Sequence, residues 1–403
     1  MNILHIIDHF YPKLGYQETF LAKEHSYQHN VLVITSNQFE NHIFEPNKAL
    51  LKRKVLEPAF YNEEGVKVLR LPALFDNPPF NKPWLIGLEH AVINFKPDVI
   101  IIHGVVNFSS IRIAKLKKKL WGTKLIVDDH MTFNATRGNL VLPLYGLFKR
   151  MFTPLLLNSV DCFVAVTYET KKFMQEIYGI PGERITMIPL GVDTSSFHYD
   201  PSARKDIRRK YQIPETSVVF IYAGKVIPEK GVHFLIKAGI SLCKKNENVM
   251  FLIVGGKDKR YFDSLLKIIE QASMNNRFIF IDVVPNSELY KYYSAADVGV
   301  WPLQCSISML EAASCGLPII ISDKSGALER ISKGNGIAYK EGDVIDLERK
   351  MSLLLDDKLR NSMRQQAYEY VKEIDWKIIA QQFLHACERP RINTGTELYN
   401  GKN

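Results

Sequence analysis

Short apolar runs recur along the first half of the chain, and amphipathic segments separate them. The runs are rich in Val and Ile, which is typical of strands buried on both faces of a parallel sheet. Segments such as 17–28 and 110–120 have the spacing of helices that bury one face. The alternation predicts an α/β fold, with strands at Ile3–Ile7, Val31–Thr35, Val66–Leu71, Val99–His103, Lys124–Val127 and Cys162–Val166.

The same pattern starts again in the second half. A proline and a glycine break the periodicity within Ile188–Phe197. We therefore predict two doubly wound, Rossmann-like domains, residues 1–195 and 196–375, that face each other across a cleft. Helices are expected at 231–244, 258–273, 287–294 and 308–315, between strands at Val218–Ala223, Met250–Val254, Phe278–Asp282, Val298–Trp301 and Ile319–Ser322.

Composition narrows the class of protein only moderately. The chain has 403 residues, 46% hydrophobic and 24% charged, which excludes a disordered chain, a collagen and a coiled coil. Its five cysteines form no C-x-x-C pair, which disfavours a zinc ribbon and a disulfide scaffold and suits a reducing cytoplasm. The first residues resemble a strand and not a signal peptide. We find no apolar run long enough to predict a transmembrane helix.

Positive charge is concentrated in one stretch. The net charge of the chain is +9, and nine basic residues between Val99 and Val160 stand against only two acids, a local net charge of +7. Such a stretch suits an anionic lipid surface, a phosphorylated substrate or nucleic acid, or it forms a solvated basic face. The nine residues are Arg112, Lys115, Lys117, Lys118, Lys119, Lys124, Arg137, Lys149 and Arg150.

The segment Gly224–Gly231 is the first candidate for chemistry, because it follows the expected strand 218–223 and opens a helix. Glycine lets backbone approach a ligand, and a helix start offers free N–H groups to an anion. Lys225 and Lys230 add two cations, which predicts a site for an anion such as a diphosphate. The alternative is a tight turn with two exposed lysines. The segment is not a Walker A loop, because G-x-x-x-x-G-K-[ST] is missing.

A second candidate is the loop and helix after the expected strand 298–301. Ser306 or Ser308 is predicted to cap this helix, whose start can meet phosphate oxygens. Glu311 falls about one turn inside, where its carboxylate can accept hydrogen bonds from a ribose diol. The alternative for Glu311 is a structural carboxylate that ties the helix to the loop.

Two further candidates lie in the first half of the chain. Gly15 stands between the first strand and the first helix, where it would let the loop approach a phosphate or a sugar; the alternative is an ordinary turn. His130 ends the run Asp128–His130 after a strand, where a histidine can act as a hydrogen-bond partner or base. The alternative is a loop histidine satisfied within the protein. His103 is placed in a similar way, and we favour a structural role for it.

Several common signatures are missing. The sequence has no Asp-x-Asp triplet, which disfavours a sugar-nucleotide site built on a metal held by that motif. No G-x-G-x-x-G follows the first strand, which argues against a nicotinamide or flavin enzyme. No G-x-S-x-G is present, so the usual hydrolase elbow is excluded.

Taken in order, these segments resemble the glycosyltransferases of family four, which have the GT-B fold. The strongest match is Ala223–Val232, which is similar to the family's Gly-Arg/Lys…Glu-Lys-Gly turn. Leu310–Ile319 resembles the second half of the family's donor motif. Asp375–Leu384 resembles the final helix that crosses back onto the N-terminal domain, at about 376–390. Weaker matches are Phe251–Gly256, Val284–Val298 and the interdomain link Ile188–Asp193.

The resemblance implies a retaining enzyme that moves a hexose-type sugar from a UDP- or GDP-linked donor to an acceptor hydroxyl. The C-terminal domain would hold the donor and the N-terminal domain the acceptor. By position, Lys225 and Lys230 would act on the donor diphosphate and Glu311 would bind the ribose. His130 would lie near the transferred sugar. The other donor-binding residues implied in this way are Gly15, Tyr16, Gly224, Val284, Gln304, Ser306, Ile307 and Ser308.

Two positions depart from the family pattern. Tyr16 stands where the family often has the second of two glycines. Leu303 occupies the position of the first glutamate of the donor motif, which normally contacts sugar hydroxyls, and Gln304 is its polar neighbour. No carboxylate is well placed as a nucleophile. The resemblance therefore favours a front-face mechanism without a metal, in which the acceptor proton passes to the departing phosphate.

The basic stretch falls in the expected acceptor domain. Residues 111–124 and 140–152 mix basic with aliphatic and aromatic side chains, which predicts a peripheral contact with an anionic membrane. An acceptor on a lipid carrier would follow, as in polysaccharide or glycolipid assembly, in a cytoplasmic protein at the inner face of the cell membrane. The alternative for 140–152 is packing in the core or in an oligomer interface.

Three rival functions remain. A sugar-nucleotide epimerase of the same fold would keep its product linked to the nucleotide. A non-catalytic protein of the GT-B fold would bind sugar or lipid, and Leu303 is its best support. Nucleic-acid binding is disfavoured, because the chain lacks a recognised nucleic-acid module.

Overall fold

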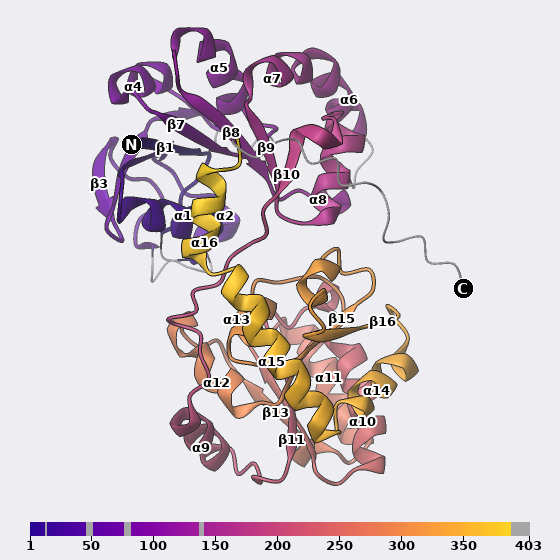
Figure 1. Cartoon of the computed structure of the whole chain (residues 1–403). Helices are drawn as coiled ribbons and strands as arrows, with labels where there is room; N and C mark the ends of the chain where they lie inside the picture. Colours follow the sequence, from indigo (N-terminus) through magenta and orange to yellow (C-terminus); the bar gives the residue numbers. More distant parts are fainter. Residues whose placement is uncertain (13, 46–50, 76–81, 137–140, 388–403) are drawn as a thin grey trace. The chain divides into compact units, whose positions relative to one another are not determined.

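The computed structural model describes residues 1–12, 14–45, 51–75, 82–136 and 141–387. Contacts divide the chain into two compact units (Figure 1). Unit 1 is Met1–Pro189 with Trp376–Asn403, and unit 2 is Leu190–Asp375. The sequence analysis places this boundary at residue 195, and the contacts place it after Pro189. Each unit is built on its own mainly parallel sheet, as the alternating pattern predicts.

Unit 1 has an eight-stranded sheet in the order β10-β9-β8-β7-β1-β2-β4-β3. The central strands are mainly apolar and buried along most of their length, because helices cover both faces of such a sheet. The strands are β1 Asn2–Ile7, β2 Asn30–Ser36, β3 Ala59–Glu63, β4 Val66–Leu71, β7 Val99–His103, β8 Lys124–Asp129, β9 Cys162–Ala165 and β10 Ile185–Met187, beside a small ribbon of β5 Ala73–Leu74 and β6 Trp84–Leu85.

One edge strand of this parallel sheet runs in the opposite direction. β3 pairs antiparallel with β4, with Glu63 opposite Val66. Glu64 and Gly65 make the connection, and both have positive φ angles of 53° and 85°. This is the backbone that a two-residue hairpin requires, and the sequence analysis missed it because β3 itself is largely exposed and carries little apolar signal.

Along the chain, most helices of unit 1 connect one strand to the next. The last helix, α16, packs against α1 (Figure 1), where the ring of Trp376 stacks on Phe20 with centroids 5.1 Å apart. No helix in the described ranges is both long and apolar enough to cross a bilayer. The helices are α1 Gln17–Ser26, α2 Asn41–Phe44, α4 Leu88–Phe95, α5 Phe108–Leu116, α6 Val141–Met151, α7 Thr153–Ser159, α8 Tyr168–Phe173 and α16 Trp376–Leu384.

Unit 2 has a six-stranded, fully parallel sheet in the order β13-β12-β11-β14-β15-β16. Its strands are β11 Val218–Ala223, β12 Val249–Val254, β13 Phe278–Ile281, β14 Val298–Trp301, β15 Ile319–Ser322 and β16 Gly336–Tyr339. Its helices are α9 Pro201–Lys210, α10 Val232–Lys245, α11 Lys259–Gln271, α12 Leu289–Ala295, α13 Ser308–Ser314, α14 Val344–Leu353 and α15 Asp357–Glu373.

Each sheet has one switch point, where the strand order reverses. In unit 1 it lies between β1 and β7, and in unit 2 it lies between β11 and β14. Ligands of doubly wound sheets bind beyond the carboxyl ends of the strands at such points. The loops after these four strands are therefore the places to look for a site.

Candidate functional site

The loop after β11 is held in one shape by glycines. Gly224 and Gly231 have φ angles of 153° and 70°, a region that favours glycine. The Val226 N–H donates to the Gly256 carbonyl at 2.7 Å, so this loop pairs with the loop after β12. A Cβ on Gly255 would lie 2.1 Å from the carbonyl oxygen of Gly224. The two loops thus touch backbone to backbone.

The predicted lysines extend from this loop. Lys225 is exposed, whereas Lys230 is half-buried and donates to the carbonyl of Cys305 at 3.4 Å. In the part of the chain that the structure describes, neither lysine pairs with a carboxylate. Burial lowers the pKa of Lys230, and the positive charges of Lys225 and Arg330 lower it further. A bound anion would relieve this repulsion.

Arg330 is a third cation, which the sequence analysis missed. Its side chain is buried, with 4% of its surface exposed, and its guanidinium donates to the carbonyl of Ser306 at 2.6 Å. No carboxylate among the described residues pairs with it. It lies on the short turn Leu328–Ile331 after β15, where no motif marks it in the sequence. The three cations therefore gather beside the loop after β14 without a counter-charge.

The loop after β14 is fixed from within the unit. The Ser308 hydroxyl donates to the carbonyl of Ala223 at 2.8 Å, and the Trp301 indole N–H donates to Ser308 at 3.0 Å. The prediction that Ser306 or Ser308 caps α13 is wrong, because the N-cap residue is Ile307 and no side chain caps the helix. The two serine hydroxyls instead lie 2.9 Å apart. Ser308 thus holds the loop against β11.

Leu303 packs onto the loop after β11. A Cβ built on Gly231 would lie 2.5 Å from Cγ of Leu303, so position 231 needs glycine for space as well as for its φ angle. Gln304, beside it, is half-buried and makes no hydrogen bond within the described ranges. An apolar side chain therefore packs against Gly231, the residue after Lys230, at the position where the resemblance implies a carboxylate.

Glu311 lies in the first turn of α13 with 6% of its surface exposed. Its Oε1 accepts from the Asn286 amide at 3.0 Å and its Oε2 from the Tyr293 hydroxyl at 3.2 Å. Burial raises the pKa of Glu311, and the two hydrogen bonds oppose that shift. Each oxygen keeps acceptor capacity for one further donor. Asn286 and Tyr293 have no role in the sequence analysis, and Val284, near them in the chain, is half-buried.

The remaining candidates belong to unit 1. Gly15, with a φ of 70°, precedes Tyr16, the N-cap of α1. The Tyr16 ring meets Tyr11 edge-on with centroids 5.8 Å apart, and burial raises the pKa of Tyr16. The side chain of His130 is exposed, and its backbone N–H donates to Oδ1 of Asp129 at 2.7 Å.

A chain of buried histidines lies behind this turn. Nδ1 of His103 lies 2.9 Å from Oδ2 of Asp128, which also accepts from the Gln17 amide at 2.8 Å. Nε2 of His103 lies 3.1 Å from Nδ1 of His5, and Nε2 of His5 lies 3.1 Å from Nδ1 of His25. The sequence analysis singled out His103 but not the other two, because nothing local connects them.

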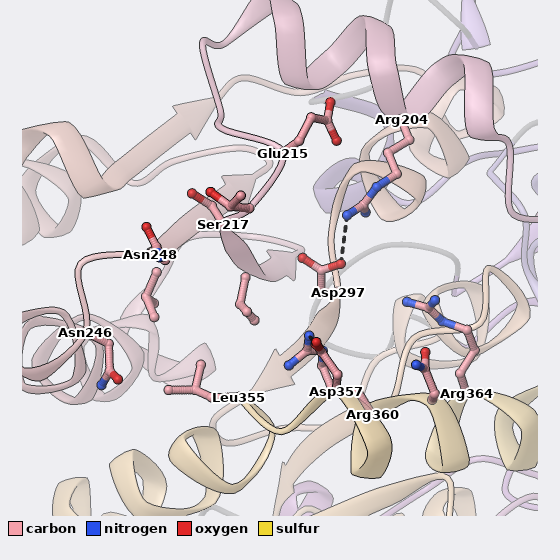
Figure 2. A pocket seen from close by; sticks show the side chains of 14 residues that line it. Arg204, Glu215, Ser217, Asn246, Asn248, Asp297, Leu355, Asp357, Arg360 and Arg364 are labelled. Carbon is pink, nitrogen blue, oxygen red and sulfur yellow. Dashed lines mark hydrogen bonds and ion pairs between the residues drawn. The ribbon is translucent and has the colours of Figure 1, made fainter.

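A separate cavity of about 540 Å³ lies at the amino ends of the unit 2 strands (Figure 2). Its arginines already have partners. Arg204 donates to Asp297 at 3.0 Å, and Arg364 donates to the carbonyl of Gly316 at 3.2 Å. None of the predicted site residues lines this cavity. It therefore does not coincide with the switch point that holds the cations.

Comparison with known proteins adds to this geometry. Residues 203–370 match the family "Glycosyl transferases group 1", and residues 21–196 match "Glycosyltransferase Family 4". Together the two matches span most of the chain.

Two curated relatives illustrate the likeness. The GDP-mannose-dependent alpha-(1-6)-phosphatidylinositol monomannoside mannosyltransferase of Mycolicibacterium smegmatis is 28% identical over 199 residues, 47% of this chain and 50% of that protein. The D-inositol 3-phosphate glycosyltransferase of Corynebacterium glutamicum is 26% identical over 286 residues, 67% of this chain and 68% of that protein. The chain thus spans about half the length of the first of these relatives.

A solved structure shares the fold over nearly the whole chain. The Anabaena protein HepE in complex with UDP superposes with a TM-score of 0.70 at 19% identity, covering 96% of this chain and 100% of that one.

Proposed function

We propose a sugar-transfer reaction for this chain, which belongs to the group 1 glycosyl transferases and to glycosyltransferase family 4. The chain moves a hexose-type sugar from a UDP- or GDP-linked donor to the hydroxyl of a glycan or lipid-linked acceptor. The configuration at the anomeric carbon is retained. The observation that carries the proposal is the group of Lys225, Lys230 and Arg330 at the switch point of unit 2. These cations lack a carboxylate partner in the described ranges. A diphosphate has the matching charge.

The chemistry follows from these groups. The bond between the anomeric carbon and the diphosphate oxygen breaks while the acceptor oxygen bonds to that carbon from the same face. The acceptor proton passes to the departing phosphate oxygen. Lys225, Lys230 and Arg330 would stabilise the negative charge that the diphosphate gains, and Glu311 would accept hydrogen bonds from the ribose. Because side chains supply this positive charge, we expect transfer to continue in the presence of a chelator.

Unit 1 would supply the acceptor side of the reaction. His130 is exposed at the carboxyl end of β8, and we assign it as a hydrogen-bond partner of the transferred sugar. Gly15 and Tyr16, at the start of α1, are assigned to the donor phosphates by their position after β1. The ring of Tyr16 limits how closely the backbone of this loop can approach a ligand.

A donor screen by calorimetry tests the proposal. The M. smegmatis relative is named for GDP-mannose and the HepE structure holds UDP, so both nucleotides and their common sugars belong in the screen. Binding of one nucleotide that is weakened in Lys230→Ala but unchanged in Lys237→Ala, an exposed lysine of α10, supports the proposal. Failure of the wild type to bind either nucleotide at millimolar concentration refutes the donor site.

The same screen separates the rival functions. Binding without transfer or cleavage of any sugar nucleotide favours a non-catalytic binding protein. Release of an epimer still linked to the nucleotide favours an epimerase. Transfer of the sugar to an added glycan or lipid-linked acceptor favours the transferase.

Helix α6 has an exposed apolar face that supports the predicted membrane contact. One face of α6 packs in the core of unit 1 through Phe148, while its other face exposes large apolar side chains, of which Leu144 is 64% exposed. Lys149 and Arg150 follow in the last turn. We assign this exposed face, formed by Leu142, Leu144, Leu147 and Met151, to a peripheral contact with an anionic membrane.

The second predicted segment is only partly available for such a contact. Residues 111–124 do not form one basic helix, because α5 ends at Leu116 and a short turn follows. Arg112 is buried and pairs with Glu89, and Lys117 pairs with Asp161 at 2.9 Å. The exposed part that remains is Lys115, Lys118, Lys119 and Trp121, the last 94% exposed.

Vesicle sedimentation tests this contact. We expect the double variant Leu144→Glu, Trp121→Ser to lose binding to vesicles that contain phosphatidylglycerol, with its melting temperature unchanged. The exposed Tyr168→Ser of α8 serves as the control. Equal binding by wild type and double variant would remove the membrane assignment. Arg137 and Leu140, which the sequence analysis included, lie outside the described residues.

A further inference from the structure

The buried histidines of unit 1 form an unbroken chain with an acceptor at each end. At one end, Nε2 of His25 lies 2.9 Å from the carbonyl oxygen of Ala380 in α16. At the other end, Nδ1 of His103 lies 2.9 Å from the Asp128 carboxylate. His5 joins the two at 3.1 Å on each side. The three histidine rings, the Ala380 carbonyl and the Asp128 carboxylate all belong to unit 1.

The proton count of this chain is fixed by its ends. A carbonyl cannot donate, so Nε2 of His25 carries a proton, and its Nδ1 must accept if the ring is neutral. His5 then donates from Nε2 and accepts at Nδ1, and His103 donates from Nε2. The last link to a carboxylate needs a proton on Nδ1 of His103 as well. Four hydrogen bonds thus require four protons, one more than three neutral imidazoles carry.

The Asp128 end of the chain has few other supports. Both its described donors, the His103 ring and the Gln17 amide, reach Oδ2, and Oδ1 is buried without a hydrogen bond in the described part of the structure. Breaking the link to His103 would leave a buried carboxylate with one donor, which is costly. The adjacent Asp129 accepts from the backbone N–H groups of His130 and Met131, both at 2.7 Å. The acceptor at the end of the histidine chain is therefore the residue directly before the one that holds the turn with His130.

We propose that His25, His5 and His103 form a chain that holds one extra proton and couples the seating of α16 to the Asp128–His130 turn, so that the three histidines are positioning residues for His130. The part of this inference that concerns His130 rests on the proposed function. The proton count and the coupling to α16 do not.

The hydrogen bonds of the histidine chain are all present only within a limited range of pH. Loss of the extra proton leaves Nδ1 of His103 facing a carboxylate with no hydrogen between them. A second proton on His25 or His5 sets two N–H groups against each other. The chain is therefore intact only while it holds one extra proton, and either change breaks a link.

The charges around the chain agree with this window. Burial opposes a charge on His103, but Asp128 and Glu18 outweigh it and raise the pKa of His103. Burial lowers the pKa of His25 to about 4, and the positive charge of His29 adds to that shift. Burial and its two histidine neighbours lower the pKa of His5. Asp129 and His130 are the other titratable groups at the Asp128 end.

Nitrogen-15 NMR of the histidine rings in the full chain tests the proton count without reference to activity. We expect His103 of the wild type to carry protons on both ring nitrogens at neutral pH, protected from exchange with solvent. In Asp128→Asn the new amide can itself donate to Nδ1 of His103, so all four links persist with three neutral rings. Three neutral histidines in the wild type would overturn the proposal.

Hydrogen–deuterium exchange tests the coupling. His5→Gln removes the middle link, and we expect faster exchange at the α16 amides and at those of His130 and Met131. The control is His90→Gln, an exposed histidine whose ring contacts Asn94. Unchanged exchange at both places in His5→Gln would overturn the coupling. If Asp128→Asn fails to fold, His5→Gln and His25→Gln still test the coupling between α16 and the Asp128–His130 turn.

Kinetics then tests the positioning of His130. We expect His5→Gln to lower kcat about tenfold to a hundredfold, with affinity for the bare nucleotide unchanged because Lys225, Lys230 and Arg330 lie in unit 2. In Asp128→Asn the alkaline limb of the pH profile of kcat should disappear. A wild type that transfers no sugar would refute the proposed function but would leave the NMR and exchange results able to decide the proton chain. Normal kcat and pH profile in both variants would overturn the positioning role.

Discussion

The two switch points of this molecule have the same topology and opposite electrostatics. In unit 2, Lys225, Lys230 and Arg330 gather without a carboxylate partner in the described ranges. In unit 1, the Asp128 carboxylate is buried together with the His103 ring, whose Nδ1 lies 2.9 Å from Oδ2 of Asp128. Unpaired cations, as in unit 2, suit a site that binds an anion. Buried charges that pair with each other, as in unit 1, suit a region that keeps one fixed structure.

The difference arises in the loops and not in the sheets. β1 lies between β2 and β7 just as β11 lies between β12 and β14. After β11 comes a glycine-bounded turn that carries the exposed Lys225 and the half-buried Lys230, whereas the carboxyl ends of β7 and β8 place His103 and Asp128 in the core. The same fold therefore hosts two kinds of chemistry.

The largest effect is expected from Gly231→Val, which should abolish nucleotide binding. Valine is strained at a φ of 70°, and its Cβ would lie 2.5 Å from Leu303. Calorimetry measures the loss. The control is Gly342→Val, which has a φ of 80° but open space around it. Equal loss in the control would show that a strained valine destabilises unit 2 as a whole, and the loss in Gly231→Val would then not report on the site.

A smaller loss is expected from Lys230→Ala. If Lys230 bonds to a phosphate as proposed, removing this partly buried cation should weaken nucleotide diphosphate binding about tenfold to a hundredfold. The effect should shrink for the uncharged nucleoside, and Lys237→Ala should bind normally. If the nucleoside loses as much affinity as the diphosphate, the anion assignment of unit 2 fails.

In unit 1, His103→Gln should lower stability without changing nucleotide affinity. The raised pKa of His103 means that its contribution is complete below the unfolded pKa of about 6.5 and is lost as pH rises through the folded value. We expect a loss of about 1–3 kcal/mol at pH 6, shrinking as the pH rises, measured by urea unfolding. A loss that stays constant with pH would contradict the ion pair. A fall in nucleotide affinity would break the contrast between the two units.

The smallest effect is expected from Leu303→Glu. A carboxylate beside Lys230 would raise the pKa of that lysine and offset part of the positive charge. Bare nucleotide diphosphate should then bind about twofold to fivefold more weakly, because solvent screens part of the charge of a half-buried ion pair. Leu303→Gln, of the same length but uncharged, separates charge from shape. Tighter binding of a sugar nucleotide than of the bare nucleotide, in the glutamate variant alone, would show that position 303 contacts the sugar.

Much of the fold could be predicted from local pattern. The strands at 66–71, 99–103, 218–223, 298–301 and 319–322 begin and end where the apolar runs do, because burial on both faces leaves a strong signal. β3 was missed because an exposed edge strand leaves almost none. The predicted cap at Ser306 or Ser308 was wrong because the Ser308 hydroxyl donates to the carbonyl of Ala223, at the end of the neighbouring strand β11, and not to its own helix.

The sequence by itself determined the two sheets, their glycine turns and the lysines at 225 and 230, since each depends on neighbours within one element and its loop. Only the tertiary structure decided that Arg330 joins those lysines and that Asn286 and Tyr293 hold Glu311. The histidine chain is the extreme case, because His5 and His103 meet across 98 positions. Hydrogen bonds and charge pairs of this kind depend on which strands become neighbours, and no local periodicity encodes that choice.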